Sequence, residues 1–352
     1  MLILFSVPKV RAFNELSNIF NKIFIMRKIL GVGNALVDIM TLIDDDKILE
    51  RFNLPKGSMQ LVDNEKSELI KTETGQLTRT ITSGGSAANT IHGLAMLGTV
   101  TGFIGSVGND PAGDIFENDM KKAGVNTRLF RTNSATGTAI TLISADTERT
   151  FATHLGAAVD LGPDDLRSEY FKGYDILYLE GYQISNSSLI YKVCQLAKSN
   201  KMEIALDLAS YNVVDQYAGL FREIIMNYID IVFANEEEAR SLTGKPPEEA
   251  LTVLARLCHT AVVKIGKEGS LIQQGDNKIK IESVPVNCID TTGAGDLYAS
   301  GFLYGYVNDI SLEKCGQLSS LLAGRVIESV GARIAAEKWP EMREKVNNII
   351  NN

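Results

Sequence analysis

Short apolar segments alternate with longer segments through the second half of the chain. The segments 175–179, 203–208 and 229–234 are short and apolar, which predicts buried strands. The longer segments between them, 186–198 and 216–227, are predicted to be helices. Regular alternation of this kind predicts a parallel sheet with helices on both of its faces. The chain is therefore predicted to have an α/β fold.

The same pattern extends over most of the chain. Further strands are predicted at 29–33, 40–43, 59–62, 100–104, 261–265 and 278–281, and further helices at 64–69, 88–97 and 111–124. A long helix is predicted at 312–327, with Cys315, Leu318 and Leu322 directed inward. Ligands of parallel sheets bind beyond the carboxyl ends of the strands, where Glu180 and Asp207 are expected to be exposed.

Three segments differ from this alternation. Residues 126–131, 138–143 and 150–154 are rich in threonine, which predicts strands, with a turn at 144–148 between the last two. His154 stands at the end of the last segment. A lone histidine at a strand end is usually structural, so a structural role is expected, with a ligand-facing position as the alternative.

Composition narrows the class of protein. The chain of 352 residues is 45% hydrophobic and 22% charged, which is ordinary for a globular protein. Its net charge of −8 argues against a nucleic-acid scaffold and against a binder of anionic membranes. The sequence contains no apolar run long enough to span a bilayer. The cysteines and histidines are scattered along the chain and lack the spacing of a metal site: Cys194, Cys258, Cys288, Cys315, His92, His154 and His259. We therefore predict that the cysteines are reduced and that the protein is cytoplasmic.

Residues 1–25 are predicted to be an extension upstream of the natural start. Met26 directly precedes the first predicted strand. Lys9, Arg11 and Glu15 interrupt the apolar N-terminus, so a secretory signal fits poorly. An amphipathic arm that packs on the body of the protein is the alternative.

A glycine-rich stretch, Asp290-Thr291-Thr292-Gly293-Ala294-Gly295-Asp296, precedes an apolar segment that is predicted to be a helix. Small residues permit a tight turn and close approach of the backbone to a ligand. The N-terminus of the helix would bind an anion through its free N–H groups. Asp296 would then lie beside that anion, where a general base could deprotonate a hydroxyl. The alternative is an aspartate that only caps the helix.

A second glycine motif, Gly84-Gly85-Ser86-Ala87-Ala88-Asn89, also precedes a predicted helix. It is either a tight turn before a packed helix or a backbone that a sugar ring approaches closely, with Asn89 bonding to hydroxyls. Asp38 lies between Val37 and Ile39, where a buried carboxylate needs partners. Its partners are either backbone N–H groups or ligand hydroxyls.

Two further stretches follow predicted strands. Asn235-Glu236-Glu237-Glu238 begins a helix, and an asparagine N-cap with an acidic first turn explains it structurally. The segment 261–270 is predicted to be a strand that leads into a glycine loop. A simple hairpin between two strands is the purely structural interpretation of that segment.

In this order, the motifs resemble those of the ribokinase-like (PfkB-type) carbohydrate and nucleoside kinases, from about Lys28 to about Ala335. The resemblance implies a three-layer α/β/α fold with a mostly parallel central sheet and a small β-sheet lid. It assigns 26–37, 63–130 and 155–352 to the large domain, and 38–62 and 131–154 to the lid. The threonine-rich strands are expected to join those near 38–62, and closure of the lid would exclude water from the reaction.

The resemblance also implies roles for individual residues. Asp296 would be the general base, with an anion hole at Gly293, Ala294 and Gly295. Substrate contacts are expected at Asp38, Gly84, Gly85, Asn89 and Glu180, and nucleotide contacts at Asn235, Lys264, Gly266, Gly269 and Thr292. Mg²⁺ is expected at Glu238 and Asn235, partly through water, since Mg²⁺ retains several waters and takes few carboxylates. Asp290 resembles a position near a monovalent-cation site, with K⁺ as the ion.

The predicted reaction transfers the γ-phosphoryl group of ATP to a primary hydroxyl. The motifs are most similar to the adenosine kinase branch, so a nucleoside acceptor is predicted. The alternative is a sugar acceptor of the ribokinase, fructokinase or 2-keto-3-deoxygluconate kinase type. A non-catalytic ligand-binding protein of the same fold is a further alternative, which the intact Asp296 and glycines oppose.

Other classes lack their motifs. The sequence has no Gly-x-x-x-x-Gly-Lys-Ser/Thr stretch, which disfavours a P-loop kinase. No Gly-x-Gly-x-x-Gly follows the first predicted strand, which disfavours a dinucleotide oxidoreductase. Neither a nucleic acid nor a membrane is expected as a partner. The resemblance implies a homodimer that pairs through lid edges, since an exposed sheet edge invites pairing.

Overall fold

The computed structural model describes residues 27–146 and 148–352, so the prediction about residues 1–25 lies outside the described residues. In this part of the chain, nine strands form the larger sheet, in the spatial order β14-β13-β12-β11-β10-β9-β1-β5-β6. Their bounds are β1 (Ile29–Val32), β5 (Thr101–Gly108), β6 (Asn126–Thr132), β9 (Ile176–Glu180), β10 (Glu203–Asp207), β11 (Ile231–Asn235), β12 (Thr260–Lys264), β13 (Ser270–Gln274) and β14 (Asn277–Ile281). The pairings from β6 to β12 are parallel, which confirms the predicted sheet, and β13 and β14 run antiparallel.

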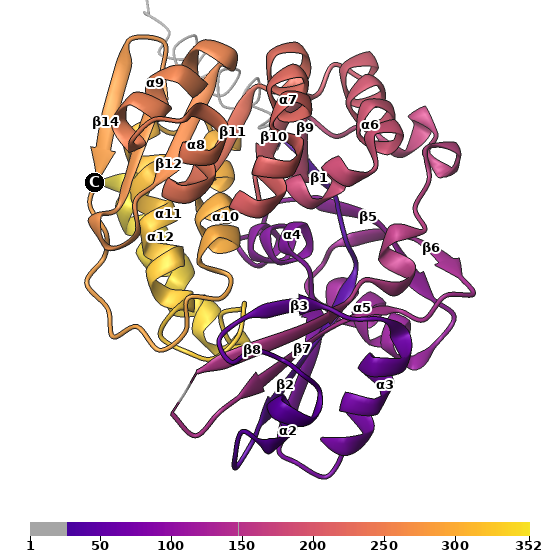
Figure 1. Ribbon diagram of the computed structural model, residues 1–352. Helices are drawn as coiled ribbons and strands as arrows, with labels where there is room; N and C mark the ends of the chain where they lie inside the picture. The colour runs from indigo at the N-terminus through magenta and orange to yellow at the C-terminus, as the bar shows by residue number, and fades with distance from the viewer. Residues whose placement is uncertain (1–26, 147) are drawn as a thin grey trace, which may run out of the picture.

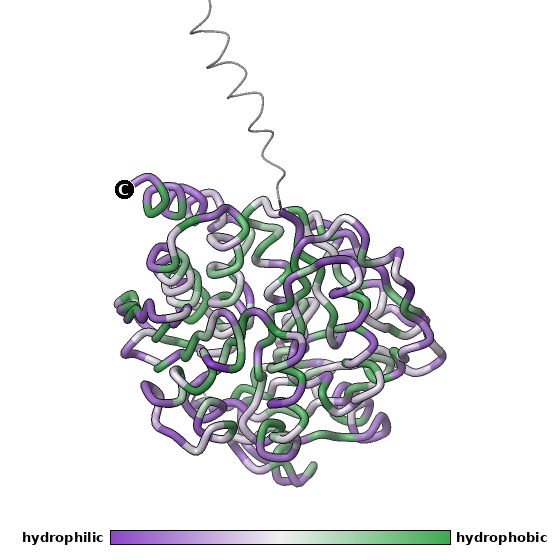
Figure 2. Tube along the Cα trace, turned by 90° about the horizontal axis from the view of Figure 1, so that it is seen from above, coloured by the Kyte–Doolittle hydropathy of each residue, from purple (hydrophilic) through white to green (hydrophobic). Residues whose placement is uncertain are grey.

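Helices cover both faces of the larger sheet, which gives the predicted three layers (Figure 1). Alternate residues of a strand point to opposite faces. Leu177 and Leu179 of β9 therefore pack with one set of helices, whereas Ile176 and Tyr178 pack with the other. The first set comprises α6 (Ser187–Ser199), α7 (Tyr211–Tyr228), α8 (Glu236–Thr243) and α9 (Pro247–Leu257), and the second α4 (Ser86–Met96), α5 (Pro111–Lys122) and α10 (Ala294–Val307). Figure 2 shows hydrophobic segments through the middle of the molecule and mostly hydrophilic ones around its rim.

A smaller sheet lies below the larger one in Figure 1. Its strand order is β3-β8-β7-β2-β4. The bounds are β2 (Leu36–Leu42), β3 (Met59–Leu61), β4 (Arg79–Gly84), β7 (Gly137–Ile143) and β8 (Arg149–His154), and the short helices α2 (Lys47–Arg51) and α3 (Asn64–Glu73) accompany them. We call this sheet the lid.

Two strands belong to other sheets than expected. The segment 126–131 is part of β6, which pairs with β5 of the larger sheet. This agrees with the assignment of residues 63–130 to the large domain, but not with the expectation that all three threonine-rich strands join the lid. As an edge strand with many exposed positions, β6 carries threonine and arginine and so resembles the lid strands in composition. The segment 79–84, assigned to the large domain and not predicted as a strand, forms β4 and pairs with β2 in the lid. Ile81 is its only large apolar residue, so it shows no buried-strand pattern.

Helix α10 packs tightly between α4 and α11 (Leu312–Val326), which in turn contacts α12 (Trp339–Asn351). A Cβ on Gly301 would lie 2.7 Å from the backbone of Leu318, and a Cβ on Gly305 would lie 2.7 Å from the sulfur of Cys315. Glycines thus let α10 approach α11 closely. The residues predicted to face inward on α11 are fully buried, as predicted: Cys315, Leu318 and Leu322. Among the described residues, no helix combines the length and the apolarity needed to cross a bilayer.

Gly301→Ala is expected to destabilise the protein by about 1–3 kcal/mol, because its methyl group would overpack the contact between the two helices. Gly219→Ala is the matched control. Gly219 lies in α7 with open space at the position of its Cβ, so alanine should stabilise that helix by about 0.5–1 kcal/mol. Urea unfolding of the three proteins measures both changes. Equal stability of the two variants would contradict close packing at Gly301.

Candidate active site

A cavity of about 380 Å³ lies between the lid and the carboxyl ends of the strands β10, β11 and β12. The final residues of these strands, Asp207, Asn235 and Lys264, line it. The cavity brings together most of the predicted site residues: Asp38, Gly85, Asn89, Asn235, Glu238, Lys264, Asp290, Thr292, Gly293, Gly295 and Asp296. It also contains residues that were not predicted, among them Met40, Ser86, Arg149, Phe151 and Tyr182.

The stretch 290–296, which we call the signature turn, ends at the start of α10. Gly293 has a φ of 77°, and a Cβ there would lie 2.6 Å from the backbone of Ala332, so glycine is needed for both conformation and space. The N–H of Ala294 donates to the Thr291 carbonyl at 3.2 Å and is therefore less free than predicted. Gly295 faces the cavity in the first turn of α10, where helix N–H groups have no acceptor within the helix.

Asp296 lies in this first turn and points toward the second glycine motif. Its carboxylate accepts hydrogen bonds from Ser86 Oγ at 2.7 Å and from Asn89 Nδ2 at 3.0 Å. Desolvation raises the pKa of Asp296 to about 6, although these two hydrogen bonds lower it. A carboxylate with this pKa is ionised at neutral pH and is a better proton acceptor than an ordinary aspartate, which suits a general base.

Asp38 of β2 faces the same cavity from the lid. Gly84 makes room for it, because a Cβ on Gly84 would lie 2.1 Å from Asp38 Oδ1. Gly85, with a φ of 97°, turns the chain from β4 into α4. Desolvation raises the pKa of Asp38 to about 6, and the charge of Arg333 lowers it. No side-chain hydrogen bond to the Asp38 carboxylate occurs within the described residues, which leaves it available for ligand hydroxyls.

A cation and several acidic groups line the opposite wall. Lys264 Nζ is paired with Asp207 Oδ2 at 2.8 Å, and it lies 3.1 Å from where a Cβ of Gly295 would be. The lysine therefore stands beside the N-terminus of α10. Desolvation raises the pKa of Glu238 to about 7, against the lowering effect of Lys264.

Asn235 and Glu238 form the capping box of α8. Glu238 accepts hydrogen bonds from the Asn235 N–H at 2.8 Å and from Asn235 Nδ2 at 2.7 Å, while its own N–H donates to Asn235 Oδ1 at 2.8 Å. The structural reading of this stretch is thus confirmed. Both side chains also line the cavity, and their remaining lone pairs fit a metal ion held through water. No group of three or more acidic, histidine or cysteine side chains suited to bind a metal directly occurs in residues 27–146 and 148–352.

Asp290 is paired with an arginine of the lid. Its carboxylate forms an ion pair with Arg149 of β8 and accepts the N–H groups of Thr292 at 2.8 Å and Gly331 at 2.6 Å. With a guanidinium on this carboxylate, the arrangement does not fit a monovalent cation bound directly to Asp290.

Glu180 has a different position from the one expected. It is fully buried rather than exposed at the sheet edge, and it accepts hydrogen bonds from the N–H groups of Asn34 and Ala87, both at 2.8 Å. Burial raises its pKa to about 7. Glu180 therefore holds the start of α4 against the β1–β2 connection, and it does not line the cavity. Asp207, also expected to be exposed, is buried but does line the cavity.

Three predicted glycine positions serve backbone geometry outside the cavity lining. Gly266 and Gly269 have φ values of 55° and 94° in the turn between β12 and β13, which confirms the hairpin at 261–270. A Cβ on Gly269 would collide with the Ile281 carbonyl oxygen. Gly84 acts through the space it leaves for Asp38.

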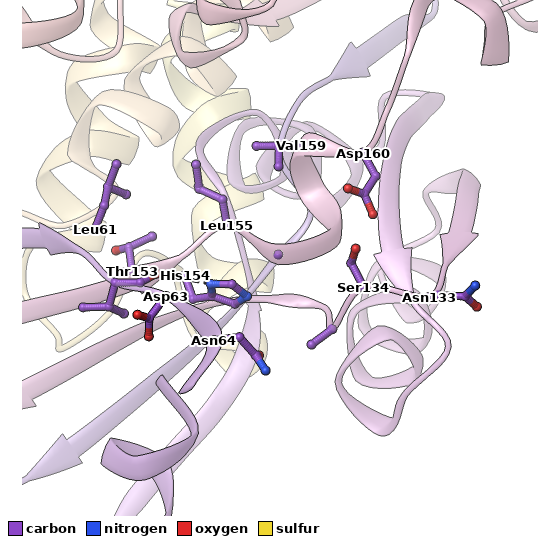
Figure 3. Close-up of a pocket in the computed structure, with 13 residues that line it drawn as sticks. Leu61, Asp63, Asn64, Asn133, Ser134, Thr153, His154, Leu155, Val159 and Asp160 are labelled. Carbon is purple, nitrogen blue, oxygen red and sulfur yellow. Dashed lines mark hydrogen bonds between the residues drawn. The ribbon is translucent and has the colours of Figure 1, made fainter. Parts of the chain in front are cut away.

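A second pocket, of about 690 Å³, lies at the β3–β8 edge of the lid (Figure 3). Lid residues on one side of it face the loop 133–135 and the segment 155–160, which contains the 3₁₀ helix Gly156–Val159, on the other. Its lining mixes apolar and hydrogen-bonding side chains: Leu61, Val62, Asp63, Asn64, Asn133, Ser134, Ala135, Thr153, His154, Leu155, Gly156, Val159 and Asp160. His154, expected to be structural, has its Nδ1 3.2 Å from the Val62 carbonyl oxygen and also lines this pocket.

Sequence reasoning missed the contributions of Arg149, Phe151 and Arg333. Arg149 and Phe151 alternate along β8, so they share the face of the lid that lines the cavity. This alternation along the strand could have predicted that both side chains face the cavity. Arg333 lies in a loop without periodicity, and nothing in its local sequence indicates a contact with α4.

Comparison with known proteins identifies the family and supports the fold. The family described as pfkB family carbohydrate kinase matches residues 58–339. Two solved structures are each 35% identical with a TM-score of 0.81: a probable sugar kinase protein from Rhizobium etli CFN 42, covering 92% of this chain and 98% of that one, and the adenosine kinase from Sinorhizobium meliloti, covering 91% and 99%. An uncharacterized sugar kinase from Archaeoglobus fulgidus is 30% identical over 250 residues, which is 68% of this chain and 96% of that protein.

Asp296→Asn is expected to stabilise the protein at neutral pH. The pKa of Asp296 is raised from 3.8 to about 6, so the folded state binds this proton more tightly than the unfolded state does. The contribution of this group to stability therefore falls as pH rises from about 4 to 6, and asparagine avoids a loss of up to roughly 3 kcal/mol. Urea unfolding should show the gain at pH 8 and none below about pH 4. A variant less stable than the wild type at pH 8 would contradict the raised pKa.

Proposed function

The chain belongs to the pfkB family of carbohydrate kinases, and we propose that it transfers the γ-phosphoryl group of ATP to a primary hydroxyl of a nucleoside. The observation that carries this proposal is the position of Asp296. Its carboxylate stands at the N-terminus of α10 and faces Asp38 and Asn89 in one cavity. A base, an anion site and groups that bind hydroxyls are thus within reach of one acceptor.

The reaction needs positioning and charge neutralisation more than covalent chemistry. Asp38 and Asn89 would orient the acceptor by binding its other hydroxyls. Asp296 would take the proton of the attacking hydroxyl, and the N–H groups in the first turn of α10 would stabilise the negative charge of the transferred group. Lys264 would contribute its positive charge on the nucleotide side. A bound Mg²⁺ would neutralise phosphate charge, and Asn235 and Glu238 would hold it through water.

The lid supports a nucleoside as the acceptor. Asp38, Ala139, Thr153 and Leu61 are consecutive neighbours across four strands, from β2 to β3. The row begins at Asp38 in the cavity and ends in the second pocket, which Thr153 and Leu61 line. Neighbouring strands are about 4.8 Å apart, so Asp38 and Thr153 are separated by about 10 Å. This span suits an acceptor with a sugar at one end and a base at the other.

Apolar side chains flank this row. Phe151 and Met40 line the cavity from the adjacent row of the lid, and Leu61 is 66% exposed. The second pocket adds hydrogen-bonding groups, among them Asn64 and Ser134. A planar heterocycle needs both kinds of contact, apolar walls for its faces and polar groups for its edges. The apolar C–H face of a free sugar would cover less of this surface than a planar heterocycle would.

A sugar acceptor is the second candidate. The two solved structures with the same identity and TM-score are called a probable sugar kinase and an adenosine kinase, so their names do not separate the candidates. The hydroxyl-binding groups Asp38 and Asn89 would serve either acceptor. The substrate test below distinguishes them.

Asp296→Asn is expected to lower kcat by about 10²–10⁴-fold, because the attacking hydroxyl loses its proton acceptor. ATP consumption with Mg²⁺ would be measured with adenosine, inosine, guanosine, ribose, fructose and 2-keto-3-deoxygluconate. Turnover of a nucleoside that is lost in the variant supports the proposal. Turnover of free sugars alone would overturn the acceptor, and full activity of the variant would remove Asp296 from the mechanism. Absence of turnover with ATP bound would favour a non-catalytic protein.

Phe151→Ala is expected to raise the KM for a nucleoside about tenfold, since truncation removes an apolar wall of the cavity worth roughly 1–3 kcal/mol. The KM for ribose should change little. Met59→Ala is the matched control, because Met59 lies beside Phe151 on the next strand but is outside both pockets. Equal increases in the KM for ribose and for the nucleoside would contradict a base-binding role for this side chain.

A further inference from the structure

The loop that follows α11 touches the active site at consecutive residues. The N–H of Gly331 donates to Asp290 at 2.6 Å, and the backbone of Ala332 packs against Gly293. Both contacts hold the signature turn. The next residue, Arg333, extends into the body of the protein, and the reaction described above assigns it no role.

The Arg333 side chain is only 13% exposed and makes three contacts. Its Nη1 donates to Asp119 Oδ2 at 2.7 Å and its Nη2 lies 3.7 Å from the sulfur of Met120. Its Nε donates to Asn89 Oδ1 at 3.2 Å. The ion pair with Asp119 occupies one nitrogen of the guanidinium. The Nε group instead donates to Asn89, which also contacts the proposed general base, Asp296.

An arginine can only donate hydrogen bonds, whereas an asparagine amide accepts at one end and donates at the other. With its oxygen held by Arg333, the amide of Asn89 must turn its NH₂ group the other way. That group donates to Asp296 Oδ2 at 3.0 Å. The opposite rotamer would place NH₂ against a guanidinium and oxygen against a carboxylate, so both contacts would be repulsive.

Building on the proposed function, we propose that Arg333 is a positioning residue, which holds the Asn89 amide so that its NH₂ group fixes the carboxylate of Asp296. The arginine is itself held in place. Asp119 accepts hydrogen bonds from the N–H of Ser83 at 3.2 Å and from its hydroxyl at 2.5 Å. Ser83 directly precedes the second glycine motif, so the chain Ser83–Asp119–Arg333–Asn89–Asp296 links the lid edge strand to the base.

Arg333→Lys tests this role, since lysine keeps the charge beside Asp119 but has no fork of donors to reach Asn89 as well. We expect kcat to fall about tenfold, with the KM for ATP changed by less than about twofold. Asn89→Ala should lower kcat on its own. The double variant should then have the kcat of Asn89→Ala, because Arg333 acts through that residue.

Arg325→Lys is the matched control. Arg325 is partly buried and paired with Glu328 near the end of α11, outside both pockets, so its variant should keep the wild-type kcat. Losses that multiply in the double variant would overturn the proposal, because they would show that Arg333 acts independently of Asn89. Wild-type kcat in Arg333→Lys would also overturn it.

A measurement without turnover separates this inference from the proposed function. The side-chain NH₂ signals of Asn89 in a ¹H–¹⁵N spectrum are identified by their loss in Asn89→Ala. In the wild type they should exchange slowly with solvent, and in Arg333→Lys they should shift and exchange faster. Unchanged signals in Arg333→Lys overturn the inference. If the wild type phosphorylates no acceptor, the proposed function fails, while the spectra still decide whether Arg333 orients the amide.

Discussion

The active site depends on one desolvated carboxylate, that of Asp296, held ionised beside the N-terminus of a buried helix. Desolvation raises the pKa of this group, and the surrounding groups offset only part of that cost. Ser86 and Asn89 donate hydrogen bonds to it, and the charge of Lys264 acts in the same direction. The balance gives a pKa between that of a free aspartate and neutrality, which leaves a base that is both ionised and reactive.

The geometry around this carboxylate follows from close packing of glycines. Gly293 brings the signature turn against Ala332, Gly84 leaves the space that Asp38 occupies, and Gly301 lets α10 lie close to α11. In each place a methyl group would displace a functional or structural neighbour. The glycines therefore fix the distances of the site through the volume they leave empty, rather than through contacts of their own.

The sequence predicted the parallel sheet, most of the longer helices and many of the residues that line the cavity, because their signals are local. Strand periodicity and glycine motifs lie within a few neighbouring residues. Prediction from the sequence failed for side chains whose positions depend on partners distant in the chain. Glu180 ends a strand, yet it is buried because Asn34 and Ala87 supply N–H donors from elements far away. The ion pair of Arg149 with Asp290 joins residues more than a hundred positions apart, and no local pattern encodes it.

In the proposed function, the row from Asp38 to Leu61 separates recognition of the acceptor from the chemical step. The groups proposed to carry out phosphoryl transfer lie on the larger body, in the turn at the start of α10, whereas the residues proposed to distinguish one acceptor from another lie mainly on a different sheet. Evolution can therefore exchange lid side chains one strand at a time without disturbing the reacting groups. Such a division of labour would allow a change of acceptor without a change of the chemical step.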